Sequence, residues 1–135
     1  MKENSLIIRP FQEDDEEALV YLWNLCRLTV PWNNPHKDIT RKLRVQRDLF
    51  LVGYLENSLV SSVMAGYEGH RGWINYLAVH PDFQGRGYAT HLIEVVEKKL
   101  RNLGCPKINL QIRKENDSVH LFKNNLDLLR KISLA

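Results

Sequence analysis

A glycine-rich turn between a predicted strand and a predicted helix constrains the fold of this chain more than any other feature. The turn, residues 84–89, has the sequence Gln-Gly-Arg-Gly-Tyr-Ala. An apolar run from Trp73 to Val79 precedes it, and an amphipathic segment from Thr90 to Leu103 follows it. A strand that enters a helix through such a turn directs backbone N–H groups and the positive end of the helix dipole at one place. The expected guest is a phosphate or pyrophosphate group.

Two common phosphate-binding motifs do not fit this turn. A Walker P-loop ends in Gly-Lys-Ser/Thr, and the turn lacks that ending. A Rossmann fingerprint follows the first strand of its domain and carries a third glycine. Here Gly85 and Gly87 are followed by His91 and Leu92 rather than by a third glycine. The motif also comes late in the chain rather than after the first strand. A further interpretation is that the glycines serve only the geometry of a tight turn.

The hydrophobic pattern predicts a mixed sheet flanked by helices on both faces, in an α+β (α/β/α-layered) domain. Strands are expected near residues 6–9, 49–55, 59–67, 73–79 and 107–113, with a short edge strand at 132–134. Helices are expected near residues 13–26, after an N-cap at Asp38, and over residues 87–103 and 119–125. A chain of 135 residues predicts one domain, residues 1–135.

The composition is ordinary for a globular protein, with 44% apolar and 26% charged residues. The 19 basic and 16 acidic residues leave a net charge of +3, too weak and too evenly spread to favour nucleic acid as a partner. Neither a signal peptide nor a membrane-length apolar run is present, so we expect a cytoplasmic protein without a membrane partner. Cys26 and Cys105 follow no metal or redox spacing, which predicts structural thiols and no metal.

The segment from Ile74 to Ala89 resembles the acetyl-CoA-binding core of the GNAT superfamily of N-acetyltransferases. Its string Val-His-Pro-Asp-Phe-Gln-Gly-Arg-Gly-Tyr-Ala is quite specific, and the order of elements is similar from Leu6 to about Phe122. Residues 31–35, 69–72 and 104–108 are similar to the small bacterial YpeA-type acetyltransferases. The resemblance implies the GNAT fold and transfer of an acetyl group from acetyl-CoA to a primary amine of a small molecule or peptide.

The resemblance also implies a cofactor site at the end of that strand and in the turn. Backbone N–H groups of the turn would hold the pyrophosphate, and the strand backbone would pair with the pantetheine amides. Arg86 would add a charged contact or point into solvent, and Asn116 would contact the cofactor, cap the last helix, or both. The predicted cofactor-binding residues are Leu77, Ala78, Val79, Gln84, Gly85, Arg86, Gly87, Tyr88, Ala89, Asn116 and Phe122.

Two catalytic positions of the family are changed in this chain. Many relatives carry a tyrosine acid seven residues after the family's asparagine, where this chain has Lys123. Some relatives carry a glutamate on the preceding strand, where this chain has Gln111. Lys123 is therefore either a substitute acid or a solvated helix lysine. The last strands look shortened, with Leu-Asp-Leu at residues 126–128 where relatives have Leu-Gly-Phe/Tyr.

Three residues remain as candidates for the base that deprotonates an amine of pKa about 10.4: Glu68, His70 and Tyr76. His70 is otherwise an exposed loop residue. Trp32 and Trp73 either line an acceptor pocket or pack in the core. Without its usual catalytic groups, the chain has a second interpretation, a non-catalytic acyl-CoA-binding or partner-binding module. A homodimer is a possible assembly.

Overall fold

Six strands form one mixed sheet within the residues that the structure describes. This computed structural model describes residues 5–29, 34–110 and 133–134. The strands are β1 (Ile7–Pro10), β2 (Phe50–Leu55), β3 (Ser58–Tyr67), β4 (Gly72–Val79), β5 (Ile108–Leu110) and β6 (Ser133–Leu134). The α-helices are α1 (Glu16–Leu25), α2 (Pro35–Lys42) and α3 (Tyr88–Asn102).

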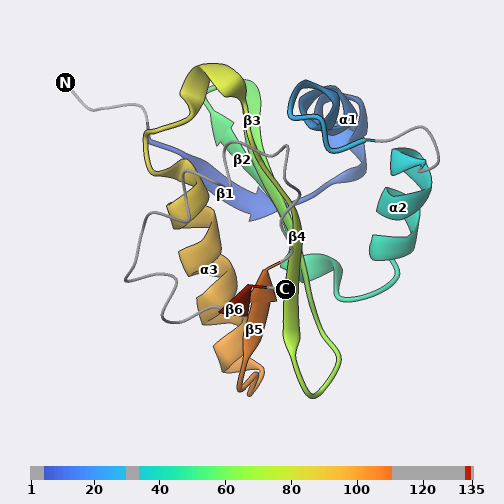
Figure 1. Cartoon of the computed structure of the whole chain (residues 1–135). Helices are drawn as coiled ribbons and strands as arrows, with labels where there is room; N and C mark the ends of the chain where they lie inside the picture. The colour runs from blue at the N-terminus through green and yellow to red at the C-terminus, as the bar shows by residue number, and fades with distance from the viewer. Residues whose placement is uncertain (1–4, 30–33, 111–132, 135) are drawn as a thin grey trace.

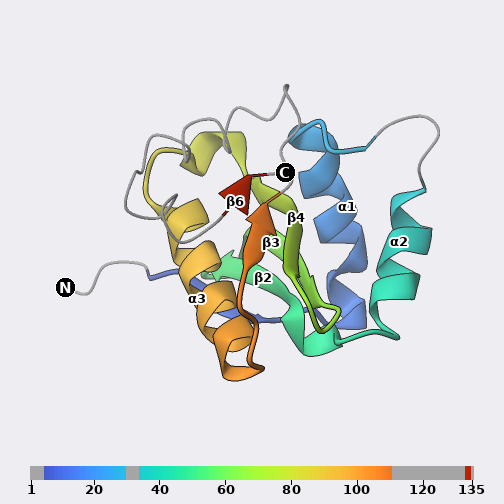
Figure 2. The ribbon, with the colours of Figure 1, turned by 60° about the horizontal axis from the view of Figure 1, so that its bottom comes forward.

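The sheet is covered by helices on both faces (Figure 1). Its strands lie in sequence order from β1 to β6. The pairs from β1 to β4 are antiparallel, and the pairs β4–β5 and β5–β6 are parallel. Figure 2 shows α1 and α2 together on one face and α3 on the other. The α+β prediction, with a mixed sheet between two helical layers, is confirmed.

The strands β2, β3 and β4 contribute to two apolar cores, because successive strand residues face opposite sides of a sheet. In β2, Phe50 and Val52 pack with α1 and α2, whereas Leu51 packs with α3. The apolar face predicted for this helix is Ala89, Leu92, Ile93, Val96, Leu100 and Leu103: Leu103, just past the end of α3, is 50% exposed, Ala89 is half-buried, and the four central members are fully buried. Burial of such a side chain stabilises the fold by roughly 1.5–3 kcal/mol. This packing anchors α3 so that its first turn follows directly from the end of β4.

The N-terminus of α2 differs from the prediction. The side chain of Asn34 accepts hydrogen bonds from the backbone N–H groups of His36 and Lys37, at 3.0 and 3.3 Å. Asn34 is therefore the N-cap, and Pro35 takes the first helical position. The N-cap prediction at Asp38 is wrong because Asn-Pro supplies both a cap acceptor and a preset φ one turn earlier. Asp38 lies inside the helix instead.

Several predictions fall partly or wholly outside the described residues. The strand predicted at 107–113 is described over Ile108–Leu110, and the edge strand predicted at 132–134 is confirmed as β6. The helix predicted at 119–125 and the shortened final strands lie in residues 111–132, outside the described residues. The single-domain prediction for residues 1–135 stays a prediction.

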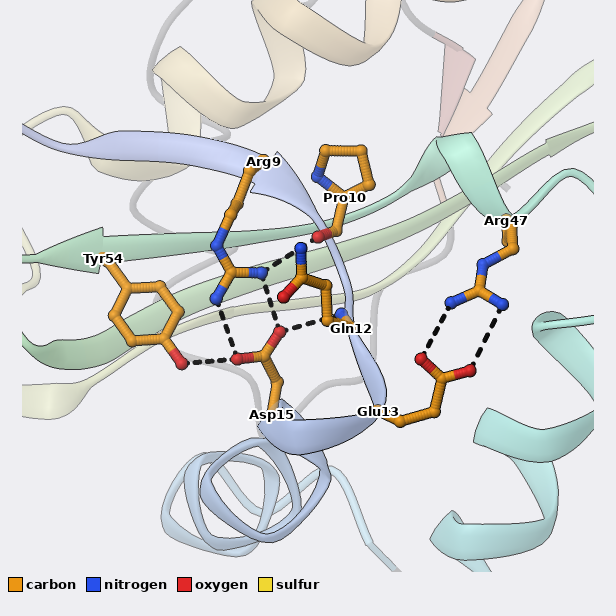
Figure 3. A network of polar contacts seen from close by, with 7 residues as sticks. All are labelled: Arg9, Pro10, Gln12, Glu13, Asp15, Arg47 and Tyr54. Carbon is orange, nitrogen blue, oxygen red and sulfur yellow. Dashed lines mark hydrogen bonds and ion pairs between the residues drawn. The ribbon is translucent and has the colours of Figure 1, made fainter.

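A polar network joins β1, β2 and the start of the first helix (Figure 3). The guanidinium of Arg9 donates two hydrogen bonds to the carboxylate of Asp15, at 2.8 and 2.9 Å. The hydroxyl of Tyr54 and the backbone N–H of Gln12 donate to the same carboxylate, at 2.5 and 2.8 Å. Burial alone would raise the pKa of Asp15, but these donors hold it below its usual value. The network therefore stabilises the ionised carboxylate at a place where Asp15 is only 3% exposed.

Candidate functional site

The glycine-rich turn has the backbone geometry of a phosphate cradle. Gly85 and Gly87 have φ of +81° and +85°, a region that glycine adopts without steric cost. A Cβ on either glycine would meet no atom of the described residues within 4 Å. Gly87 is the N-cap of α3, and no side chain caps this end in the described part of the chain. The N–H groups of the first turn therefore have no intrahelical acceptor, and the described residues leave the space next to both glycines unfilled.

The charges around the turn favour an anion. The first turn of the 15-residue helix α3 contains no acidic residue, so the positive end of its dipole is not neutralised there. Arg86 is exposed, and its guanidinium lies 5.0 Å from the centre of the Phe83 ring. Tyr88 and Ala89 are half-buried and pack against the apolar cores. The side chains of Tyr88 and Ala89 thus fix the turn, and the backbone N–H groups are what it offers to a ligand.

One side-chain contact ties the turn to β4, and a second stabilises the segment 80–83 between them. The amide of Gln84 donates to the carbonyl of Val79, the last residue of β4, at 3.0 Å. The ring Nδ1 of His80 accepts the backbone N–H of Asp82 at 3.1 Å. The cradle is therefore held at the carboxyl end of β4. The last described pair between β4 and β5 is Ile74 with Leu110, so Leu77–Val79 lie beyond it.

β4 contains a bulge at Tyr76. Ser62 of β3 pairs with Ala78 and Met64 pairs with Asn75, so β4 has one residue more than β3 between these pairs. Tyr76 has φ of +52°, which is uncommon for a residue other than glycine. In a regular strand, neighbours such as Asn75 and Tyr76 would face opposite sides of the sheet. The bulge turns both of them toward α2, where they line one cavity.

Contacts from α1 and β3 hold the bulge in place. The ring of Tyr76 stacks on Trp23, with ring centres 4.0 Å apart. The hydroxyl of Ser62 donates to the carbonyl of Tyr76 at 3.3 Å and accepts the indole N–H of Trp23 at 3.0 Å. The buried Trp23 and Ser62 therefore stabilise a strained backbone next to the predicted cofactor-binding strand.

Two cavities of about 360 and 290 Å³ adjoin each other between α2 and β4. Both are lined by the same four residues, Lys42, Val45, Met64 and Asn75. We call the combined space the α2–β4 groove. One end is lined by Asp38, Arg41 and Tyr76. The lining of the other end includes Gln46, Tyr67, Glu68 and Trp73.

The polar groups of the α2–β4 groove differ in how well they are paired. The hydroxyl of Tyr76 donates to Oδ2 of Asp38 at 2.5 Å, and Arg41 donates to Oδ1 at 3.1 Å. In contrast, the buried Oδ1 of Asn75 has no hydrogen-bond partner among the described residues. Burial lowers the pKa of Lys42, and the nearby charge of Asp48 only partly opposes this shift. The groove thus offers a paired carboxylate, an unpaired amide oxygen and a desolvated ammonium group.

The predicted catalytic residues have different positions. Tyr76, Glu68 and Trp73 line the α2–β4 groove. His70 is exposed in the β3–β4 loop and is not among the lining residues. Lys123, together with Gln111, Asn116, Phe122 and Trp32, lies outside the described residues.

Sequence reasoning missed Asp38, Lys42 and Asn75 as site residues. Asp38 and Lys42 are four residues apart, so they share one face of α2, and this spacing is a signal that could have linked them. Their place opposite Asn75 depends on the bulge and has no local signal.

The two cysteines have structural positions, as predicted. Both are buried. The thiol of Cys26 donates to the carbonyl of Val79 at 3.3 Å, and that of Cys105 donates to the carbonyl of Lys107 at 3.2 Å. Burial raises the pKa of Cys26 to about 11, so its thiol stays protonated and unreactive near neutral pH.

No group of three or more His, Cys, Asp or Glu side chains is arranged to hold a metal ion in the described ranges. Over the same ranges, none of the helices has the length and apolarity needed to cross a membrane.

Comparison with known proteins decides the family. The model of the acetyltransferase (GNAT) family matches residues 10–126. This chain belongs to the GNAT family. An acetyltransferase of Pectobacterium atrosepticum is 55% identical over 112 residues, which cover 83% of this chain and 79% of the relative. An acetyltransferase of Yersinia pestis is 51% identical over 120 residues, which cover 89% and 85%.

Solved structures show the same fold. The ribosomal-protein-S18-alanine N-acetyltransferase of Escherichia coli has a TM-score of 0.71 at 17% identity, covering 90% of this chain and 76% of that one. The PaiA N-acetyltransferase of Thermoplasma acidophilum, solved with coenzyme A, has a TM-score of 0.69 at 16% identity, covering 90% and 88%. A GNAT acetyltransferase of Brucella melitensis, solved with acetyl-CoA, has a TM-score of 0.62 at 19% identity, covering 78% and 75%. The predicted GNAT fold is confirmed, and family membership supports acyl transfer as the general activity.

Proposed function

We propose that this GNAT protein transfers the acetyl group of acetyl-CoA to a primary amine of a small molecule or peptide. The observation that carries the proposal is the pair of left-handed glycines, Gly85 and Gly87, at the start of α3, where the described residues supply neither a side-chain cap nor an atom within 4 Å of an added Cβ. Two solved structures with this fold contain coenzyme A or acetyl-CoA, which supports the choice of ligand.

The cofactor roles follow the geometry of the turn and of β4. Backbone N–H groups of residues 84–89 would hold the pyrophosphate at the start of α3. The backbone of Leu77–Val79 would pair with the pantetheine amides in the manner of an added strand. Arg86 is exposed beside the turn and would contribute charge, while Asn116 and Phe122 are proposed contacts from the resemblance alone.

The α2–β4 groove is the proposed acceptor site, because β4 leads from the cradle to the bulge that lines it. When bound, acetyl-CoA supplies a thioester whose acetyl carbon accepts the lone pair of the amine and whose thiolate leaves. The amine must lose a proton for this attack. Tyr76 can accept that proton on its phenolic oxygen while passing its own proton to Asp38, 2.5 Å away. Among the three predicted base candidates, the geometry therefore favours Tyr76, with Asp38 as the final acceptor.

Two measurements test the proposal. Acetyl-CoA should raise the melting temperature, and free CoA should be released when a panel of amines is added. No thermal shift at saturating acetyl-CoA would contradict the cofactor site. Binding without release of CoA for any amine would favour the alternative, a non-catalytic acyl-CoA-binding or partner-binding module. That alternative is retained because Lys123 and Gln111 stand where relatives carry catalytic groups. The variant Lys123→Tyr would test whether a tyrosine at this position raises turnover.

A further inference from the structure

We propose that the acceptor is a small amine that carries a carboxylate a few bonds away, such as an apolar amino acid. Lys42 binds the carboxylate inside the α2–β4 groove, and Asn75 accepts an N–H of the amine. This inference rests on the proposed function, because it names the substrate class of the same site.

Lys42 is the cation of the groove lining that has no carboxylate within ion-pair distance among the described residues, although the charge of Asp48 acts on it from farther away. Lys42 lines both cavities, whereas Arg41, the other cation of the lining, is paired with Asp38 at 3.1 Å. Within the described ranges, Lys42 forms no ion pair. Its half-buried position lowers its pKa through desolvation. A desolvated ammonium group gains more from an anionic ligand than a solvated one, because water does not screen the interaction.

The neighbours of Lys42 leave its ammonium group available to a ligand. The side chains of Lys42 and Gln46 both end next to Gly66 of β3. A Cβ placed on Gly66 would lie 3.5 Å from Nζ of Lys42 and 3.5 Å from Oε1 of Gln46. The Gln46 amide is already used: Oε1 accepts the N–H of Tyr67 at 2.8 Å, and Nε2 donates to its carbonyl at 3.0 Å. Gln46 therefore holds the wall of the groove, while the ammonium donors of Lys42 remain for a carboxylate.

Asn75 supplies the complementary acceptor. Its Oδ1 is buried in the groove lining without a partner among the described residues, and an unpaired buried acceptor is costly unless a ligand satisfies it. The bulge places Asn75 next to Tyr76, whose hydroxyl contacts Asp38. An amine bound by Asn75 is thus beside the proposed proton acceptor.

The position of these groups limits the size of the ligand. Lys42 and Asn75 both line each of the two cavities, so a single small molecule bound in either cavity lies against both side chains, and an amine and a carboxylate on one small molecule suit this pair. The cavities, about 360 and 290 Å³, are in the range of small-molecule sites. Val45, Met64 and Trp73 supply apolar and aromatic walls for a side chain. An apolar amino acid combines these three features.

The experiment uses L-leucine, L-leucinamide and 3-methylbutylamine, which differ in the carboxylate. Binding to the 135-residue protein with CoA present is measured by calorimetric titration, and transfer is measured by release of free CoA from acetyl-CoA. We expect L-leucine to bind at least about tenfold more tightly than the other two compounds. Lys42→Met should remove this preference, and Lys42→Arg should restore part of it. Lys37→Met is the matched control, since Lys37 is exposed on the same helix and does not line the α2–β4 groove.

Equal binding of the three compounds to the wild-type protein would overturn the inference, as would a preference that survives Lys42→Met. No binding of any of them at millimolar concentration would also overturn it. Thermal stabilisation by acetyl-CoA, unchanged in Lys42→Met, shows that the variant is folded. A carboxylate preference in binding without CoA release would contradict the proposed catalysis while leaving this ligand site supported. CoA release from all three amines at equal efficiency would support the proposed catalysis and contradict this ligand site.

Discussion

Replacing Gly87 by alanine tests the cradle most directly, and Gly104→Ala is a matched control. The two glycines lie at opposite ends of α3 and have nearly the same φ, +85° and +89°. At both positions an added Cβ would meet no atom of the described residues within 4 Å. The two substitutions therefore impose the same backbone strain without a clash, and they differ in whether the methyl group enters the proposed phosphate site.

The magnitudes follow from this geometry. A left-handed backbone costs a residue other than glycine about 1–2 kcal/mol, so both variants should lose about that much unfolding free energy. For a chain of this size, 1 kcal/mol corresponds to about 4 °C in melting temperature. Acetyl-CoA at one hundred times its Kd stabilises the wild-type protein by about 2.7 kcal/mol, a rise of about 10 °C.

The assay is thermal unfolding with and without acetyl-CoA at one fixed concentration. A methyl group on Gly87 keeps phosphate oxygens from the hydrogen-bond distance of about 2.7–3.2 Å that the N–H groups require. If affinity falls about one hundredfold, the same concentration equals the new Kd, and the stabilisation drops to about 0.4 kcal/mol, or 1–2 °C. Gly104→Ala should keep the full rise of about 10 °C above its own lower starting point.

Two results would refute this reasoning. A full ligand-induced rise in Gly87→Ala would show that the phosphate does not approach this glycine. An equal loss of the rise in both variants would show that backbone strain in α3, rather than the blocked cradle, weakens binding.

Three further predictions concern the bulge, the polar network and the buried thiol. Tyr76→Phe keeps the stacking on Trp23 but removes the hydroxyl, so kcat should fall about 10²-fold or more with the Kd of acetyl-CoA unchanged; an unchanged kcat would exclude Tyr76 from proton transfer. The pKa of Asp15 is lowered in the folded protein, so its contribution to stability is present above its unfolded pKa of about 3.8 and is lost as the pH falls through the lower folded value. Asp15→Asn should therefore lower the free energy of unfolding by about 2 kcal/mol at pH 7 and by less in acid, as measured by urea unfolding at a series of pH values. A difference that does not change with pH would contradict the ionised network. Cys26, whose pKa is raised to about 11, should react with iodoacetamide at pH 7.5 only as fast as the protein unfolds; rapid labelling with native stability intact would show that the thiol is accessible.

Local patterns were sufficient for the cradle and the layers. The helical period of α3 and the alternation of the strands depend on residues a few positions apart, so the chain reveals them without tertiary contacts. The same holds for Gly85 and Gly87, because only glycine takes their backbone conformation freely. The strand–turn–helix order therefore predicted the layers of the fold and the place of the proposed cofactor site.

Local patterns also misled where two signals competed. Asp38 has the chemistry of an N-cap, but Asn34 followed by Pro35 begins the helix one turn earlier. That shift moves Asp38 into the helix, where its carboxylate accepts the hydroxyl of Tyr76, 38 residues away in the sequence.

The α2–β4 groove, the proposed acceptor site, arises from contacts between distant segments. Trp23 of α1 and Ser62 of β3 hold the bulge of β4, and the bulge brings Asn75 and Tyr76 to the same side. Lys42 then faces them from α2 without an ion pair among the described residues. The sequence indicates Glu68, Trp73 and Tyr76 as candidates, but it does not show that Lys42 and Asn75 meet them, because each of these two residues alone fits an ordinary helix or strand. The proposed phosphate site, made of backbone groups, could thus be predicted from the sequence, whereas the proposed acceptor site depends on side chains that meet only after the sheet and α2 have packed.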